Sequence, residues 1–599
     1  MSAVVWFKSG RVVLTGFKPL KSDREDDGEH HEVVGEEPVN SNRIEIDQDD
    51  DDTPDVYTVE NAVDEMGFGL FQVLLSIFAG LIWLAKSFEI MMLAILPAAL
   101  KCEWNLNSAE EATITMVLFF GFLLGCPVWG VMADKFGRKR TLLVVTISGF
   151  VAGLASAFSP NYYVMLVFRW LIGFGYSGSF LAAPYCLEFL PARSRAVVVC
   201  LLEAAWATGS VLEVLLALVV MTSIEYQPWR WLLGFSALPT LVVIALFILA
   251  PESPMYLITR GKHSKAKKVL SLIAKMNCKQ LPVGRLVTAE EKEQMRKETS
   301  PPLNDIAAVS TVAAMKDIND ELKCEMNEDI SNGTLPNMDN RTVPNMDNDD
   351  LTMISSDNES DSELLLDEHT HGRKQIINKL ANYYHWILIL FKNGWWRTTL
   401  LLWYLWFATN IMYYGGALLT TALFQHDEHC GLNQNNTTDD DCKELTKSDY
   451  VRLVWTTCAE FPGIIWIIVL LLVIGRKRSL ALTAFAAAVC YGLLFLCLNE
   501  TILTVFLFGV RGFATGFFQG IYVYTPEVYP TTVRAFGVSL CASVSRLGSM
   551  IAPYIAQTLL AYSSIATISL FIVFSLLSSV ASLLLPIETR GRPMKDTGG

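Results

Sequence analysis

The sequence lacks the motifs on which most enzymes and ATP-driven pumps depend. It has no G-x-x-x-x-G-K-[ST] phosphate loop, no histidine and cysteine spacing typical of zinc sites, and no nucleophile elbow. No apolar run carries the regularly spaced charges of a voltage sensor. The sequence therefore predicts that the chain is not an enzyme and needs neither a cofactor nor a bound metal.

Closely spaced cysteines and a secretory leader are also missing. The twelve cysteines contain no CxxC pair and are spread mostly through apolar runs, where we expect small buried side chains. Cys430 and Cys442 lie in a polar loop instead, which makes them the candidate pair for a disulfide. The first strongly apolar run begins near Leu70, so no cleavable signal peptide is evident.

Charge is scarce and unevenly placed. Charged residues make up 18% of the chain, against 52% hydrophobic residues and a mean hydropathy of +0.35, a composition typical of integral membrane proteins. The net charge of −14 arises from residues 22–66, with 18 acids and 2 bases, and from residues 283–372, with 21 acids and 7 bases. The rest of the chain is basic, and its bases lie at the ends of apolar runs. We therefore expect membrane lipid, and no nucleic acid, as a partner of the apolar body.

Twelve apolar runs are long enough for a membrane-spanning helix of roughly 20 residues. They form two sets of six, near 70–98, 112–133, 141–159, 162–184, 196–221 and 231–250, and near 398–424, 452–474, 479–498, 501–524, 535–559 and 565–586. The predicted domains are a disordered acidic tail at 1–66, a six-helix bundle at 67–250, a long linker at 251–397, a second six-helix bundle at 398–586 and a tail at 587–599. Residues 283–372 of the linker are of low complexity, since PNMDN at 336–340 recurs at 344–348.

The two sets of runs look like copies of one unit. The turn GVMADKFGRKR at 130–140 returns as GRKR at 475–478, and the motif Y-x-x-E-x-x-P at 185–191 returns 339 residues later at 524–530. The segment PES at 251–253 closes the first set, and PIET at 586–589 closes the second. Ordered echoes at nearly one spacing predict an internal repeat, as in parallel-repeat transporters.

These motifs carry a family resemblance. GVMADKFGRKR is similar to the loop between the second and third helices of the major facilitator superfamily, and the PES segment and paired Glu and Arg motifs resemble its sugar and organic-ion porters. The segments WRWLLGFSALP, LVWTTCAEFPG, YVYTPEVYPTTVRAFG and LPIETRGR resemble the synaptic vesicle 2-related branch, over about residues 57–285 and 392–595.

The resemblance implies an all-α membrane fold with twelve transmembrane helices in two six-helix pseudo-repeats. It also implies secondary active transport of a small organic solute or ion by alternating access, in a vesicle membrane such as that of the synaptic vesicle. A different function stays open, that of a transporter-like vesicle receptor or scaffold that no longer transports.

The loops predict which side of the membrane each segment faces. Most bases follow even-numbered runs, so both termini and the linker are expected in the cytoplasm. The loop after the seventh run then faces the lumen, where Asn435 and Asn436 match the glycosylation pattern N-x-[ST]. In the linker, Asp361, Leu365 and Leu366 fit an acidic dileucine signal read by adaptor proteins, although a chance match in a polar segment explains them equally well.

Ionisable residues inside apolar runs are the default functional candidates, because they cost several kcal/mol unless paired or hydrated. The candidates for a substrate or ion pathway, including two polar residues, are Lys86, Glu89, Glu203, Glu460, Arg546, Tyr413 and Gln519. The acids among them are candidate proton carriers, and helix packing is the alternative role for the uncharged ones. Lys86 and Glu89 are three residues apart on one helix face, so the lysine either influences the charge of the preferred ligand or pairs with Glu89.

The resemblance also implies a gating network toward the cytoplasmic end. Its members are Asp134, Arg138, Lys139, Arg169, Glu188, Arg195, Arg476, Arg511, Glu527 and Arg534. Arg169 and Arg511 begin the corresponding stretches RWLIGFG and RGFATG, and either serve in gating or scaffold pairing or contact the substrate. Leu472 stands where the family has an aspartate, so we expect the second basic loop to lack its acid partner and to form a weaker gate.

Overall fold

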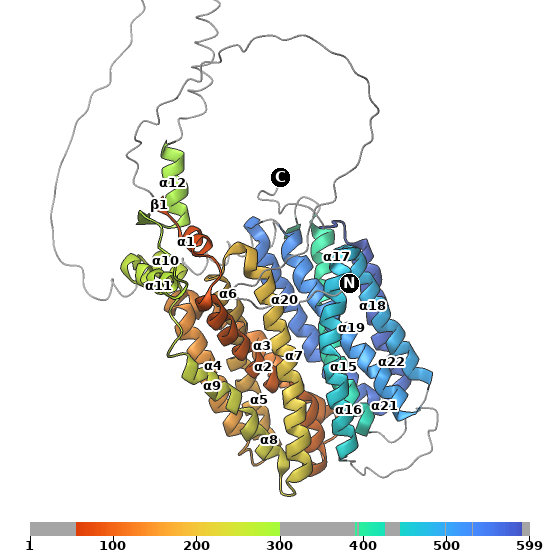
Figure 1. Ribbon diagram of the computed structural model, residues 1–599. Helices are drawn as coiled ribbons and strands as arrows, with labels where there is room; N and C mark the ends of the chain where they lie inside the picture. The colour runs from red at the N-terminus through yellow and green to blue at the C-terminus, as the bar shows by residue number, and fades with distance from the viewer. Residues whose placement is uncertain are drawn as a thin grey trace, which may run out of the picture. The chain divides into compact units, whose positions relative to one another are not determined.

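The computed structural model describes residues 56–299, 390–391, 395–425, 444–496, 499–529 and 531–589. Within these ranges the chain is almost entirely helical, and its long helices run side by side in two groups, which we call the first half and the second half (Figure 1). We call the end of the helices with the turns at Gly137 and Gly475 the basic-loop end, and the opposite end the far end.

The first half consists of six membrane-length segments. In chain order they are α2 (Leu70–Trp104), α3 (Ser108–Phe136), α4 (Arg138–Ser156), α5 (Tyr162–Ser177) with η1 (Gly178–Leu181) and α6 (Ala182–Leu187), η2 (Ala192–Ser194) with α7 (Arg195–Ser223), and α8 (Pro228–Ser236) with α9 (Leu238–Leu246). Local sequence explains where these helices begin. The Asn107 side chain, for example, accepts hydrogen bonds from the first N–H groups of α3 and forms a capping box with Glu110.

The second half repeats this order. Its elements are α15 (Trp396–Gln425), α16 (Lys447–Cys458) with α17 (Glu460–Val473), α18 (Arg476–Leu493) with η3 (Leu494–Leu496), α19 (Glu500–Val528), α20 (Thr531–Pro553) with the π-helical turn η4 (Tyr554–Thr558) and α21 (Leu559–Tyr562), and α22 (Ser564–Leu584). Eleven helical segments in the described ranges are long and apolar enough to cross a membrane. The predicted seventh span corresponds to α15, which is 30 residues long but carries Trp, Tyr, Thr and Gly residues that lower its hydropathy.

Corresponding helices pack in the same pairs in both halves. In the first half α2 lies against α7, α3 against α5 and α4 against α9, and in the second half α15 lies against α20, α17 against α19 and α18 against α22. The close approach of α3 and α5 requires Gly173, because a Cβ there would lie 2.0 Å from the carbonyl oxygen of Leu118. Gly463 allows the same close approach between α17 and α19, because a Cβ there would lie 2.1 Å from the carbonyl oxygen of Gly512. The internal repeat that the sequence predicts therefore extends to the way in which the helices of each half pack against one another.

The two basic turns are also built alike. Gly137 and Gly475 have φ angles of 107° and 89°, which side-chain-bearing residues rarely adopt. Glu252 accepts a hydrogen bond of 2.9 Å from a backbone N–H in the first turn of α4, and Glu588 accepts one of 2.8 Å in the first turn of α18. Each carboxylate thus satisfies free N–H groups and opposes the positive end of the helix dipole.

A small cap joins two segments that are far apart in the sequence. β1 (Val56–Tyr57) pairs in parallel with β2 (Arg285–Leu286), α1 (Val59–Met66) packs on α11 (His263–Met276), and α10 (Pro254–Thr259) and α12 (Ala289–Thr299) complete the segment. The Asn277 side chain ties this cap to the start of α2, because it accepts from the N–H of Phe71 at 3.2 Å and donates to Gln72 at 2.8 Å.

The cap departs from the expectation that residues 1–66 are disordered and that residues 283–372 have no fold. The four buried side chains of α1 are apolar or small and recur at helical spacing, as Val59, Ala62, Val63 and Met66. This apolar face is short and lies in a strongly acidic segment, so composition averaged over the tail concealed it. At the start of the low-complexity segment, β2 and α12 likewise form ordered structure.

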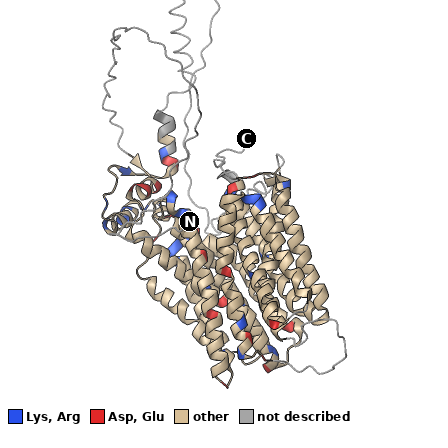
Figure 2. Cartoon of the chain, turned by 45° about the vertical axis from the view of Figure 1, so that its right-hand side comes forward, with Lys and Arg blue, Asp and Glu red and all other residues tan. Residues whose placement is uncertain are grey.

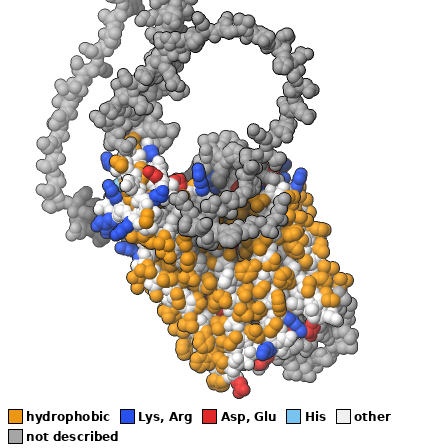
Figure 3. All heavy atoms as spheres, in the orientation of Figure 1, with side chains coloured by type: hydrophobic (Ala, Val, Ile, Leu, Met, Phe, Trp, Pro, Cys, Tyr) orange, Lys and Arg blue, Asp and Glu red, His pale blue; other side chains and the backbone are white. Residues whose placement is uncertain are grey.

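Apolar side chains cover the outer surface of the long helices. Figure 3 shows this belt on one face, with charged side chains gathered toward its two ends. Figure 2 shows that Lys and Arg gather at the basic-loop end and in the cap, while few charged residues lie within the helices. A hydrocarbon environment requires this distribution, because backbone polar groups are satisfied inside helices and apolar side chains face lipid. The described helices thus form an integral membrane body.

Candidate functional site

A chain of hydrogen bonds crosses the boundary between the halves near the middle of the helices. The indole N–H of Trp206 on α7 donates to the Tyr413 hydroxyl on α15 at 2.9 Å, and that hydroxyl donates to Glu460 on α17 at 3.1 Å. Glu460 is fully buried and pairs with Arg511 of α19 at 3.0 Å. Arg511 in turn reaches the first half, with a nitrogen 2.8 Å from the sulfur of Met91 on α2. The second-half ion pair is therefore linked to the first half at both ends.

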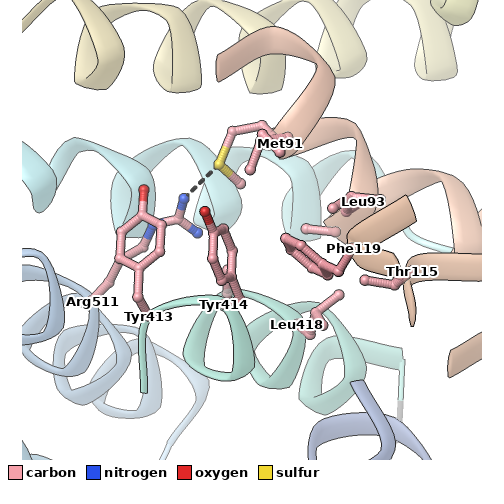
Figure 4. A pocket seen from close by; sticks show the side chains of 11 residues that line it. Met91, Leu93, Thr115, Phe119, Tyr413, Tyr414, Leu418 and Arg511 are labelled. Atoms are coloured by element: carbon pink, nitrogen blue, oxygen red, sulfur yellow. Dashed lines mark hydrogen bonds between the residues drawn. The ribbon is translucent and has the colours of Figure 1, made fainter. Parts of the chain in front are cut away.

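A cavity lies beside this chain, and we call it the Arg511 cavity. Its wall consists of Ile90, Met91, Leu93, Ala94, Thr115, Phe119, Tyr413, Tyr414, Ala417, Leu418 and Arg511. In Figure 4 the Arg511 guanidinium points toward Met91, and Tyr413 and Tyr414 stand next to each other on one helix. The wall combines α2 and α3 of the first half with α15 and α19 of the second, so relative movement of the halves would change its shape.

A second cavity, the Glu203 cavity, shares Tyr413 and Tyr414 with the first. It is lined by Trp83, Phe180, Glu203, Trp206, Tyr413, Tyr414, Thr515, Phe518, Gln519 and Tyr522. Most of these side chains are aromatic, and Glu203 adds a carboxylate against which the Gln519 amide lies. The structure thus brings Glu203, Tyr413 and Gln519, which sequence analysis selected, into the wall of one cavity.

Lys86 lies next to the Glu203 cavity without pairing with Glu89. Its ammonium nitrogen is 3.0 Å from the ring centroid of Phe180 and has no hydrogen-bond partner among the described residues. Arg546 of α20 lies over the same ring, with its guanidinium carbon 4.6 Å from the centroid. Two cations from different halves therefore lie over the ring of Phe180.

Glu89 instead pairs with Arg169. The two side chains are 2.7 Å apart, Arg169 is fully buried, and the Ser156 hydroxyl accepts a longer bond of 3.4 Å from the same guanidinium. All three residues belong to the first half. The alternative in which Lys86 pairs with Glu89 is therefore not realised.

The basic-loop end holds a separate ion pair in each half. Arg138 lies 3.2 Å from Glu188 and 3.6 Å from Asp134, whereas Arg476 donates to both oxygens of Glu527 at 3.0 Å. Burial raises the pKa of Glu188, and the charge of Arg138 opposes this rise. The second loop therefore has an acid partner.

The second loop lacks a counterpart of Asp134, as expected from Leu472. Leu472 is exposed and supplies no acid. Glu527 occupies the place of Glu188 in the repeated motif and pairs with Arg476 as Glu188 pairs with Arg138, so the second loop keeps one of the two acid partners of the first. A weaker gate at this loop stays a prediction.

The other predicted gating residues are held in different places. Arg195 pairs with Glu60 of the cap at 2.8 Å, Arg534 donates to the carbonyl of Tyr529 at 3.2 Å, and Lys139 gives its backbone N–H to Glu252. Arg169 and Arg511 belong to the buried pairs described above. The structure does not bring these ten residues together as one network.

Contacts between the halves at the far end were missed by sequence analysis. Gln557, in the π-helical turn η4, donates to Glu111 of α3 at 2.7 Å, and Glu111 pairs with Lys101 at 3.2 Å. The hydroxyls of Thr113 and Tyr554 lie 3.1 Å apart across the same boundary. π-Helical turns are often found at functional sites, but no pattern in this sequence predicts one here.

Several predicted sites lie outside the described residues. They are the candidate disulfide of Cys430 and Cys442, the glycosylation sites Asn435 and Asn436, and the sorting residues Asp361, Leu365 and Leu366. Sequence analysis also missed that Cys102 is disulfide-bonded. It did not foresee the hydroxyl of Ser236 lying 2.8 Å and 3.0 Å from the two oxygens of the buried Glu213.

The sequence matches known proteins over most of its length. Residues 87–314 and 445–597 match the sugar (and other) transporter family. The chain is 36% identical to the putative transporter svop-1 of Caenorhabditis elegans, over 92% of this chain and 89% of that protein. It is 34% identical to the synaptic vesicle 2-related protein of Rattus norvegicus, over 91% and 83% of the two chains. It is 32% identical to organic cation/carnitine transporter 7 of Arabidopsis thaliana, over 90% and 96%.

The fold matches solved transporters as well. The partially occluded, inward-open structure of the xylose transporter XylE from E. coli superposes with a TM-score of 0.56 at 14% identity, covering 87% of this chain and 99% of that one. This likeness extends the match from sequence motifs to the arrangement of helices, and it agrees with the two six-helix halves. The chain belongs to the sugar (and other) transporter family of the major facilitator superfamily, and thus to a group of transporters rather than enzymes.

Proposed function

We propose that the chain is a secondary transporter that moves a small organic solute or ion by alternating access around a central site. The observation that carries this proposal is the hydrogen-bonded chain from Trp206 through Tyr413 to Glu460, because it joins two separately packed halves near the middle of their helices. Such a link has to break and re-form when the halves rock. The relatives named as transporters, one of them for organic cations and carnitine, support a small organic solute.

We assign the driving force to a proton or ion gradient, with Glu203 and Glu460 as the best-placed carriers. Glu203 lines a cavity, and Glu460 lies on the boundary between the halves, so movement of the halves would change the surroundings of both carboxylates. Glu89 is a weaker candidate, because its partner Arg169 belongs to the same half and would move with it.

Uptake into proteoliposomes tests this function. The purified chain is offered a broad panel of metabolites under an imposed pH gradient, and at least one solute should accumulate. Glu203→Gln and Arg546→Ala should abolish that uptake, while Thr208→Val, at an exposed position of α7, should retain it. If a cooperatively folded protein takes up nothing, the alternative function of a vesicle receptor or scaffold gains the support that transport loses.

We further propose a vesicle membrane as the location, with the basic-loop end in the cytoplasm. The names of the synaptic vesicle 2-related proteins and the Lys and Arg residues at this end support the assignment. Glycosidase should then shift a glycosylated form, and replacing both Asn435 and Asn436 should remove the shift. Asn332, Asn340 and Asn358 of the linker also match N-x-[ST], and a shift that instead depends on one of them would reverse the orientation.

We propose that the signal that sorts the protein to vesicles lies in the linker. Replacing Leu365 and Leu366 with alanine should raise the fraction of the protein at the plasma membrane of secretory cells, because an adaptor could no longer retrieve it. An unchanged distribution would remove the dileucine from consideration.

A further inference from the structure

Lys86 is a buried cation that the fold leaves uncompensated. Its side chain is 2% exposed, and its ammonium group has no hydrogen-bond partner among the described residues. Aromatic rings surround it, with centroids 3.0 Å away for Phe180, 5.4 Å for Trp83, 5.6 Å for Phe122 and 5.8 Å for Trp206. Cation–π attraction offsets only part of the cost of removing an ammonium group from water.

A second cation lies against the same rings. The guanidinium carbon of Arg546, a residue only 6% exposed, is 4.6 Å from the centroid of Phe180 and 5.4 Å from that of Phe122. Arg546 is also close enough to Tyr414 for a side-chain hydrogen bond, but a tyrosine hydroxyl does not neutralise it. Lys86 comes from the first half and Arg546 from the second, so the two cations converge across the boundary.

The nearby acids do not balance these two charges. Glu89 is occupied by Arg169, and Glu460 is occupied by Arg511. Glu203 supplies one carboxylate on the cavity wall. The remaining buried acid of α7, Glu213, is ten residues further along that helix, about 15 Å away, where it binds Ser236.

We propose that Lys86 and Arg546 form an anion site beside the Glu203 cavity, which takes the carboxylate of a flat organic anion. The two cations lie over Phe180 of the cavity wall, and the wall itself carries one carboxylate, so one further negative charge restores neutrality. Carboxylate oxygens accept strong charge-assisted hydrogen bonds from both cations. The rings of Trp83 and Tyr522 in the cavity wall offer faces on which a planar ligand stacks. The proposal deepens the proposed transport function and rests on it for calling the ligand a substrate.

Direct binding tests the site without requiring transport. Thermal unfolding of the purified full chain in detergent is followed while benzoate, benzamide or benzylammonium is titrated at constant chloride. Benzoate should raise the melting temperature saturably, because binding to the folded state stabilises it. Benzamide, with the same ring and no charge, and benzylammonium, with the opposite charge, should bind about tenfold more weakly or not at all.

The variants separate the site from nonspecific effects of the anion. Lys86→Met and Arg546→Gln should each weaken benzoate binding about tenfold or more, and Lys86→Arg should retain most of it because the charge is kept. Lys267→Met removes an exposed lysine of α11 and should bind benzoate as the wild type does. The comparison of the three ligands on the wild type needs no variant, so it decides the question even if Lys86→Met does not fold.

The proposal is overturned by three results: no benzoate effect on the wild type, an equal effect of benzamide, or an undiminished effect in folded Lys86→Met and Arg546→Gln. These results are distinct from failure of the transport function. Uptake of a cation with no benzoate binding would refute the anion site and leave transport intact. Saturable, Lys86-dependent benzoate binding without any uptake would do the reverse.

Discussion

The corresponding arginine of each half has a different partner. In the first half Arg169 pairs with Glu89 of α2, and in the second half Arg511 pairs with Glu460 of α17. The first pair is made wholly by helices of its own half. The second is continued across the boundary, through the Tyr413 hydroxyl to the first half. The two halves thus have an arginine at the corresponding position but take the acidic partner from different helices. The Arg169 pair stabilises packing within the first half, whereas the Arg511 pair is part of the connection between the halves.

This difference separates two kinds of contact in a protein whose halves are proposed to move. A contact within a half persists through the movement and contributes to the stability of the fold. A contact across the boundary is present in one state and absent in another, so it contributes to the balance between states. A substitution within a half should therefore lower mainly the stability of the fold, and the matched substitution at the boundary should also change the balance between states.

Removal of Arg169 should have the largest effect. Arg169→Met leaves the Glu89 carboxylate buried without its partner, and breaking such a pair costs about 3–5 kcal/mol. Arg511→Met should lower stability less, because Tyr413 still donates a hydrogen bond to Glu460. Thermal unfolding of the purified variants in detergent measures the difference.

A double variant is the control for this prediction. Arg169→Met with Glu89→Gln leaves no uncompensated charge and should recover much of the lost stability. If Arg169→Met and Arg511→Met melt at the same temperature, the distinction between the two pairs is wrong.

Loss of the Tyr413 hydroxyl should have the next largest effect. Tyr413→Phe leaves the indole N–H of Trp206 without its acceptor and removes one of the donors to Glu460, and a buried group left unpaired costs about 1–3 kcal/mol. Part of that cost should appear as a shift between states. A cysteine introduced at Thr115, in the wall of the Arg511 cavity, should then react faster with a water-soluble maleimide than in the parent.

The matched control is Tyr404→Phe. This hydroxyl donates to the carbonyl of Phe574 at 3.3 Å, and both residues lie in the second half. It should lower the melting temperature slightly and leave the maleimide rate at Thr115→Cys unchanged. A similar increase in rate for both variants would show that the reaction reports general loosening.

The far-end contact should have a smaller effect, confined to the balance of states. Gln557→Ala removes the 2.7 Å hydrogen bond to Glu111, and about 1 kcal/mol of lost stabilisation of the state in which the halves meet at the far end corresponds to roughly a fivefold change in population. The maleimide rate at Thr115→Cys should rise by up to that factor. Thr504→Val removes an exposed hydroxyl within α19 and should leave the rate as it is.

The sequence predicts what is local or periodic in this molecule. Apolar runs predict the positions of the helices, and the spacing between the two GRKR turns predicts the internal repeat. In the structure, Glu252 and Glu588 accept equivalent hydrogen bonds at these two turns. The sequence does not predict which acid meets which base, because helix order in space decides it. Glu89 is three residues from Lys86, yet its partner is Arg169, 80 residues away.

The aromatic surroundings of Lys86 could not be read from the sequence for the same reason. Phenylalanine and tryptophan recur along the apolar runs of this chain, so their presence marks no site. Only packing places Phe180 and Trp206 within 6 Å of one ammonium group. The selection of Lys86, Glu203, Tyr413 and Gln519 as candidates rested on polarity in an apolar run. That criterion finds such residues without saying which of them share a cavity.

The smallest expected effect concerns the two loops at the basic-loop end. Arg476 donates to both oxygens of Glu527, whereas Arg138 meets Glu188 through a single contact of 3.2 Å. Lysine cannot reproduce a two-pronged pair, so Arg476→Lys should cost more than Arg138→Lys. Both pairs are partly exposed, which limits each loss to about 1 kcal/mol or less. Melting temperatures at low and at high salt measure both variants, and salt should reduce the difference. A larger loss for Arg138→Lys would mean that the first loop, with Asp134 beside it, is the more firmly held of the two.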